Sequence, residues 1–160
     1  MDPSFFAKSL EGNFKSVIGL DPGETTGVCW FVGPTLQAAQ QIIGLDVPSA
    51  FQRVKTYILA VKPDIVVMED YKIYAWKTKD HTWASLFTPR LIGAIECLCN
   101  ELRIPLVKQM AGLAKPFCTD ERLREWGFWQ RGERHSRDAI RHTCYYLLFS
   151  VAKVQVRSPT

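Results

Sequence analysis

Hydrophobic positions along the chain follow two periods, and each period predicts a different kind of element. Short apolar runs rich in β-branched residues are typical of strands, and two of them, at 16–21 and 28–32, flank the turn signal Pro22-Gly23. These two strands are expected to form a hairpin. A third strand is expected around 41–45, where it would close an antiparallel meander.

After the meander, helix and strand patterns alternate. Apolar residues three and four positions apart predict helices, and apolar runs too short for a helix predict parallel strands covered on both faces. In chain order we expect a helix at about 48–61, a strand at 64–69, a helix at about 88–103, a strand at 106–108, a helix between Thr119 and Gly127, and a helix at about 136–151. This order predicts an α/β fold with a five-stranded mixed sheet, three antiparallel strands followed by parallel ones, and helices on both faces.

Length and composition limit the organisation of the chain. Its 160 residues fit one domain, and 47% hydrophobic residues can build a packed core. We expect a flexible lead at 1–15, the domain at 16–152 and a tail at 153–160. Five cysteines without a CxxC pair support neither a disulfide framework nor a structural zinc site. No apolar run approaches the about 20 residues that cross a bilayer, and no export signal is evident, so we expect a cytoplasmic protein without a membrane partner.

The net charge of +4 permits a polyanionic partner, and most of the lysines and arginines lie in the second half of the chain. Aromatic and basic side chains alternate directly after Glu69. This composition predicts a loop that binds phosphates and stacks on an unpaired base, and an ordinary exposed loop is the plainer alternative. The candidate DNA-binding residues of this segment are Tyr71, Lys72, Tyr74, Lys77 and Lys79.

Two carboxylates end apolar strand segments, which is where α/β proteins place ligand-binding groups. Asp21 ends the first strand and Glu69 ends the fourth. If these strands are neighbours, the carboxylates face each other and repel unless a cation lies between them. Taken alone, Asp21 also fits a turn former and Glu69 a surface carboxylate. A carboxylate at the end of a run as apolar as 65–68 is nevertheless costly to bury unless it is paired or binds a metal.

Three polar side chains share one face of the last expected helix. His135 and Asp138 are three positions apart, and Asp138 and His142 are four apart, so all three lie along one face if the helix reaches back to His135. Pointed at the two strand ends, this face would complete a site of carboxylate oxygens and one imidazole. Such a site suits Mg²⁺ or Mn²⁺ better than zinc.

These residues lie in four segments that resemble, in the same order, the RuvC family of Holliday junction resolvases within the RNase H-like superfamily. The segments are 17–27, 63–69, 89–101 and 135–139, and the resemblance spans about residues 16–150. The last segment, with the aromatic and aliphatic residues after it, looks most similar to RuvC-like proteins of tailed bacteriophages. Such an origin would place the protein in the cytoplasm of the host cell.

The resemblance implies an RNase H-like fold and a nuclease that cuts branched DNA by two-metal phosphodiester hydrolysis, with two Mg²⁺ or Mn²⁺ ions per site. It makes Asp21, Glu69 and Asp138 catalytic metal ligands and His135 the fourth member of the site. Some family members have aspartate at the position of His135. The role of His135 is therefore open between metal binding, orientation of water and proton transfer.

The resemblance also implies how DNA and a second subunit bind. The family places basic residues near the scissile phosphate, and Lys108, after a strand, and Lys115, in the following loop, are the candidates. A four-way junction has two-fold symmetry, so a homodimer with one site per subunit is expected. The helix near 89–103 is expected to contribute to the contact between the subunits.

Three other functions are compatible with parts of this sequence. The segment 19–27 also resembles the phosphate loop of sugar kinases and actin-like ATPases, which pair two such domains and need a longer chain than this one. An RNase H-like nuclease that acts on RNA or on flap and fork DNA would use the same acidic site. A branched-DNA-binding protein without catalysis is the third alternative, and it would gain nothing from carboxylates directed toward phosphates.

Overall fold

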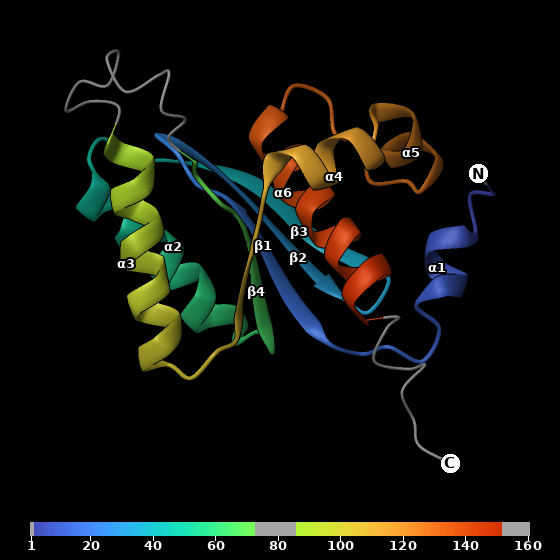
Figure 1. Cartoon of the computed structure of the whole chain (residues 1–160), viewed down its shortest axis with the longest axis horizontal. Coiled ribbons are helices and arrows are strands. Elements are labelled where there is room, and N and C mark those ends of the chain that lie inside the picture. Colours follow the sequence, from blue (N-terminus) through green and yellow to red (C-terminus); the bar gives the residue numbers. More distant parts are fainter. Residues whose placement is uncertain (1, 73–85, 152–160) are drawn as a thin grey trace.

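The computed structural model describes residues 2–72 and 86–151, which form one mixed sheet with helices on both faces (Figure 1). The strands are β1 (Ser16–Asp21), β2 (Thr25–Val32), β3 (Thr35–Ile43), β4 (Ile65–Glu69) and β5 (Leu106–Gln109). Their order across the sheet is β3-β2-β1-β4-β5, antiparallel from β3 to β1 and parallel from β1 to β5. The predicted α/β class and five-stranded mixed sheet are confirmed.

Helices cover the two faces of the sheet unequally (Figure 1). Helices α2 (Val47–Val61) and α3 (Phe87–Glu101) pack side by side on one face, over a core that includes Ile18, Leu20 and Met68. Helix α6 (Arg134–Tyr146) lies on the other face, and its last turn continues as a π-helix at Leu147–Val151. The short helices α4 (Ala111–Phe117) and α5 (Asp120–Glu125) lie beside α6. No helix in the described ranges combines the length and the apolar character that a bilayer crossing requires.

Local signals in the sequence explain where helix α2 begins and ends. The Asp46 carboxylate accepts a hydrogen bond of 2.8 Å from the backbone N–H of Ser49, and Pro48 occupies the first turn of α2, where it costs no hydrogen bond. Lys62 ends α2 in a left-handed conformation with φ of 52°, directly before Pro63. Helix α2 therefore occupies almost the whole predicted range.

Glycine allows α6 to approach the sheet closely. A Cβ atom on Gly19 in β1 would lie 2.7 Å from the carbonyl oxygen of Ala139 and would also overlap the Thr143 hydroxyl. A Cβ atom on Gly27 in β2 would overlap the backbone carbonyl of His135. Both glycines therefore face α6, and this helix packs directly on the backbones of β1 and β2.

Four expectations about the elements need correction. Strand β3 begins at Thr35 instead of about 41, because its first half is an edge strand whose alanines and glutamines carry little apolar pattern. Helix α4 lies where a loop was expected. The sequence did not predict it because a segment of only seven residues that includes Pro116 shows little helical pattern. Helix α6 begins at Arg134, slightly earlier than 136. The expected flexible lead contains a helix, α1 (Phe5–Ser9), whose Phe6 is buried in the core.

Because Gly27 faces the backbone of α6, the substitution Gly27→Ala should force the helix away from the sheet. We expect the free energy of unfolding to fall by about 1–3 kcal/mol, the usual cost of overpacking, in chemical denaturation. Gly93→Ala is the matched control, because a Cβ atom there meets nothing within 4 Å and alanine favours a helix by about 1 kcal/mol. Equal losses in both variants would contradict the close approach.

Candidate metal centre

Two carboxylates meet at the ends of neighbouring strands on the face that α6 covers. Strands β1 and β4 are parallel neighbours, and Asp21 and Glu69 are their last residues. Side chains alternate along a strand, so Asp21 shares the face of Val17, and Glu69 shares the face of Val67; both valines pack in the core beneath α6. The side chain of Asp21 is only 11% exposed and that of Glu69 is 18% exposed. Two acidic groups are thus held together with little access to water.

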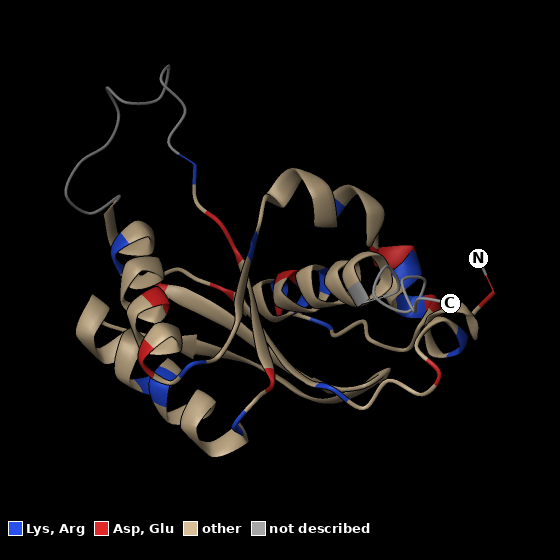
Figure 2. Cartoon of the chain, turned by 60° about the horizontal axis from the view of Figure 1, so that its bottom comes forward, with Lys and Arg blue, Asp and Glu red and all other residues tan. Residues whose placement is uncertain are grey.

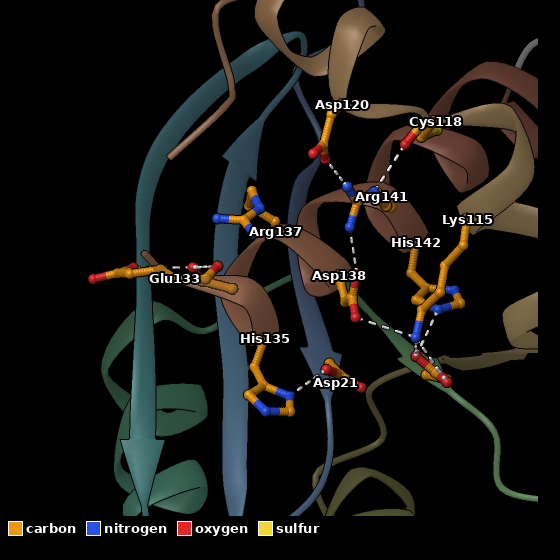
Figure 3. A network of polar contacts seen from close by, with 12 residues as sticks. Asp21, Lys115, Cys118, Asp120, Glu133, His135, Arg137, Asp138, Arg141 and His142 are labelled. Carbon is orange, nitrogen blue, oxygen red and sulfur yellow. Dashed lines mark hydrogen bonds and ion pairs between the residues drawn. The ribbon is translucent and has the colours of Figure 1, made fainter. Parts of the chain in front are cut away.

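Helix α6 adds two histidines and a third carboxylate to this cluster (Figure 3). His135 Nδ1 lies 3.0 Å from Asp21 Oδ2, and His142 Nε2 lies 3.0 Å from Glu69 Oε2. Between these histidines, Asp138 faces the cluster with a side chain that is 7% exposed. All four predicted site residues, Asp21, Glu69, His135 and Asp138, therefore lie around one centre.

A lysine from α4 lies between two of the carboxylates. Lys115 Nζ is 3.0 Å from Glu69 Oε2 and 3.2 Å from Asp138 Oδ2 (Figure 3). The ammonium group thus provides the positive charge that neighbouring carboxylates need. Lys115 was expected in a loop, and its place on a helix directed at the cluster is a correction that follows from α4.

Arg141 contacts the carboxylate oxygen of Asp138 that Lys115 does not contact. Its Nη1 lies 2.5 Å from Asp138 Oδ1, its Nε donates to the carbonyl oxygen of Cys118 at 2.9 Å, and its Nη2 pairs with Asp120 (Figure 3). Arg141 joins α6 to the segment between α4 and α5. The carboxylate of Asp138 is therefore held between two cations, Arg141 and Lys115.

The carboxylates of β1 and β4 differ in their electrostatic surroundings. Burial raises the pKa of Asp21 above its usual range, and the negative charges of Glu69 and Asp138 raise it further against the opposing effect of Lys115. Burial alone would also raise the pKa of Glu69, but hydrogen bonds from His142 and Lys115 hold this pKa well below its usual range. Glu69 is thus ionised, and Asp21 is the group whose charge lacks compensation.

Two glutamines from the outer strands complete the surroundings of the histidines. Gln41 on β3 accepts a hydrogen bond of 3.0 Å from the backbone N–H of His135, and Gln109 on β5 has its Oε1 3.1 Å from His142 Nδ1. Sequence reasoning missed both glutamines and Arg141. The spacing of four residues from Asp138 did place His142 on the same face of the helix. The contact of His142 with Gln109 depends on the pairing of β4 with β5, which the sequence does not reveal.

The remaining predicted DNA-binding residues lie away from this centre or outside the described residues. Lys108 points to the other face of the sheet, where Nζ is 2.5 Å from Glu96 Oε1 on α3. Tyr71 is half-buried against the core beneath α2 and α3, and Lys72 is exposed. The other three, Tyr74, Lys77 and Lys79, fall outside the described residues.

The donor set fits a divalent cation in its chemistry. Three carboxylates in a partly dehydrated site suit a hard ion such as Mg²⁺, and the raised pKa of Asp21 marks a deficit of positive charge. Within the described ranges, no three His, Cys, Asp or Glu side chains converge closely enough to enclose an ion. In this arrangement the Lys115 ammonium lies between Glu69 and Asp138. A metal-binding role of Asp21, Glu69, Asp138 and His135 stays a prediction.

Comparison with known proteins places the fold. No protein-family model matches the chain, and no curated protein matches its sequence. Among solved structures, Thermus thermophilus RuvC in complex with a Holliday junction substrate has a TM-score of 0.67 at 15% identity, covering 85% of this chain and 95% of that chain. A second structure of Thermus thermophilus RuvC has a TM-score of 0.61 at 16% identity, covering 86% and 96%.

A mitochondrial protein has the same architecture. The yeast mitochondrial Holliday junction resolvase Ydc2 has a TM-score of 0.60 at 11% identity, covering 95% of this chain and 87% of that chain. The chain therefore has an RNase H-like fold and is structurally similar to the RuvC and Ydc2 resolvases. The predicted fold is therefore confirmed. Sequence identities of 11–16% establish a shared fold and not a shared activity.

The raised pKa of Asp21 predicts how the metal-free protein responds to pH. A raised folded-state pKa contributes stability at low pH that is lost as the pH rises through that pKa. Asp21→Asn should therefore unfold at nearly the wild-type temperature at about pH 4 and be more stable by about 1 kcal/mol or more at about pH 8. Thermal unfolding in a chelating buffer measures this difference.

The matched control for this titration is Glu24→Gln, which makes the same charge change at an exposed residue in the adjacent turn. Its stability difference from wild type should not grow with pH. A constant difference for Asp21→Asn would show that Asp21 is not electrostatically strained.

Proposed function

We propose that this protein is a metal-dependent endonuclease that resolves Holliday junctions or other branched DNA. The observation that carries the proposal is the convergence of Asp21, Glu69 and Asp138 from β1, β4 and α6 at one partly buried centre. Lys115 and Arg141 compensate Glu69 and Asp138 but leave Asp21 with a raised pKa, so the centre can take further positive charge. Phosphodiester hydrolysis is a chemistry that uses metal ions held by such carboxylates. One of the RuvC structures is a complex with a Holliday junction substrate, and Ydc2 is named a Holliday junction resolvase; both support the choice of DNA.

In the proposed mechanism, Asp21, Glu69, Asp138 and His135 would hold two Mg²⁺ or Mn²⁺ ions. The ions would supply activation of water and stabilisation of the leaving 3′ oxygen, and the expected products would be nicks with 5′ phosphates. His135 lies at the rim with 41% of its side chain exposed, so it can also accept a proton from water beside Asp21. The buried carboxylates would orient the reacting groups, since the strand ends hold them rigidly.

Exposed cations in segments that precede or follow residues of the centre support a nucleic-acid substrate. Figure 2 colours the Lys and Arg positions along the chain. Lys72 follows Glu69 by three positions, Arg90 lies in the first turn of α3, and Arg131 and Arg134 precede His135; all four are exposed. Side chains in such places can neutralise DNA phosphates on either side of the scissile bond. Lys115 is already at the centre, and we retain Tyr71, Tyr74, Lys77 and Lys79 as proposed DNA contacts; Lys108 is not retained, because it pairs with Glu96 on the other face of the sheet.

The proposed protein acts as a homodimer. A four-way junction is cut in two opposed strands, and one chain offers one acidic centre. Two subunits related by a two-fold axis would place one centre on each strand. A nuclease that acts on flap, fork or RNA–DNA substrates would need no such pairing.

A cleavage assay tests the proposal. With Mg²⁺ or Mn²⁺ we expect paired symmetric nicks in a labelled four-way junction, and Asp21→Asn should reduce the rate by about 100-fold or more, since even partners of metal ligands are worth about 10–100-fold. Glu24→Gln, an exposed acidic control, should cut at the wild-type rate. Linear duplex, a flap and an RNA–DNA hybrid serve as competing substrates.

The substrates distinguish the alternatives. Equal cutting of flaps would broaden the protein to a branched-DNA nuclease, and preferential cutting of the hybrid would make it an RNase. If the protein binds the junction but cuts no substrate with either Mg²⁺ or Mn²⁺, it is a DNA-binding protein and the nuclease proposal is overturned.

A further inference from the structure

His142 is the most enclosed polar side chain of the centre. It lies near the middle of α6 with no exposed surface, and its ring lies between the ends of β4 and β5 (Figure 3). Nε2 is 3.0 Å from Glu69 Oε2, and Nδ1 is 3.1 Å from Gln109 Oε1. Both ring nitrogens therefore have a partner, and Gln109 is itself only 7% exposed. A buried ring with both nitrogens engaged has one orientation available.

The direction of the bond to Glu69 follows from its chemistry. A carboxylate only accepts hydrogen bonds, so Nε2 carries the hydrogen and donates it. Gln109 Oε1, from the next strand, is likewise an acceptor, so Nδ1 donates in this contact, and the bonds on both sides of the ring hold it toward Glu69. The same arrangement is common around metal sites, where a fixed partner orients a ligand.

His142 and Lys115 engage Glu69 differently. Both contact Oε2 at 3.0 Å, whereas the remaining oxygen, Oε1, is 3.3 Å from Lys115 Nζ. Lys115 reaches in from α4 on a flexible stem and its side chain is 35% exposed, while the His142 side chain is 0% exposed. Lys115 has room to leave and His142 has none. The histidine bond is therefore the permanent restraint on this carboxylate.

We propose that His142, oriented by Gln109, is a positioning residue that fixes the Glu69 carboxylate so that it can bind a divalent cation. Oε2 is bonded to the ring, which leaves Oε1, 3.3 Å from Lys115 Nζ, as the oxygen available to an ion. Without this bond, Glu69 would rotate away from the two neighbouring carboxylates, because like charges repel. The inference rests on the proposed metal-dependent function and extends it to a residue that touches neither metal nor DNA.

Metal affinity tests the inference apart from catalysis. His142→Leu removes the donor at similar volume, and His142→Gln retains an N–H donor that can reach Glu69. We expect Mn²⁺ affinity, measured by calorimetry on the full chain, to fall by about 10–100-fold in His142→Leu and by clearly less in His142→Gln. Gln109→Leu, which frees the ring, should give an intermediate loss.

Cys144→Ala is the control for a purely structural effect. Cys144 is fully buried on the same helix and packs in the core away from the carboxylates. This variant should lower the unfolding temperature but bind Mn²⁺ as tightly as wild type. If His142→Leu does the same, His142 is only a core residue and the inference is overturned.

Two further outcomes separate this inference from the proposed function. A wild-type protein that neither binds Mn²⁺ nor cuts any substrate overturns the proposed function and the inference together. If His142→Leu does not fold, the ring ¹⁵N resonances of His142 are compared in metal-free wild type and Glu69→Gln. A large shift supports the bond, and unchanged resonances overturn the inference while leaving the nuclease proposal intact.

Discussion

The close approach of α6 to the sheet is the constraint on which the centre depends. Gly19 and Gly27 remove the side chains that would hold the helix away from β1 and β2. An α6 raised by the thickness of a methyl group would lengthen the 3.0 Å contact from His135 to Asp21 and the 3.0 Å contact from His142 to Glu69 beyond hydrogen-bonding distance. The two glycines therefore determine whether three elements from distant parts of the sequence form one polar cluster.

Once α6 is close, electrostatics decides which other elements must be present. Three carboxylates on strand ends and helix repel one another strongly where water is scarce. Cations from α4 and α6 oppose this repulsion: Lys115 joins Glu69 to Asp138, and Arg141 joins Asp138 to Asp120. Lys115 and Asp120 thus tie the short helices α4 and α5 to the acidic centre. Asp21 contacts His135 and also shares a side-chain hydrogen bond with Glu69, so it remains the place where added positive charge stabilises most.

The sequence predicted what depends on periodicity and missed what depends on register. Apolar runs and helical spacing located all five strands and the long helices, and strand ends identified Asp21 and Glu69. Helix α4 was not predicted because seven residues that include Pro116 show almost no helical periodicity. The contact of Lys115 with Glu69 was therefore not foreseen. Gln109 reaches His142 only because it pairs with Glu69 in register; a shift of one residue would have presented Lys108 instead.

The fold and the acidic centre leave the choice of substrate to the surfaces around them. Carboxylates and divalent ions act on any phosphodiester, and RNase H-like architecture alone does not select a nucleic acid. Selection must come from groups that contact the strand beyond the scissile bond. Exposed Arg131 and Arg134 precede His135 in the sequence, and exposed Lys72 follows Glu69. Substrate choice should therefore depend on exposed groups of this kind and not on the carboxylates of the centre, which would act on any phosphodiester in the same way.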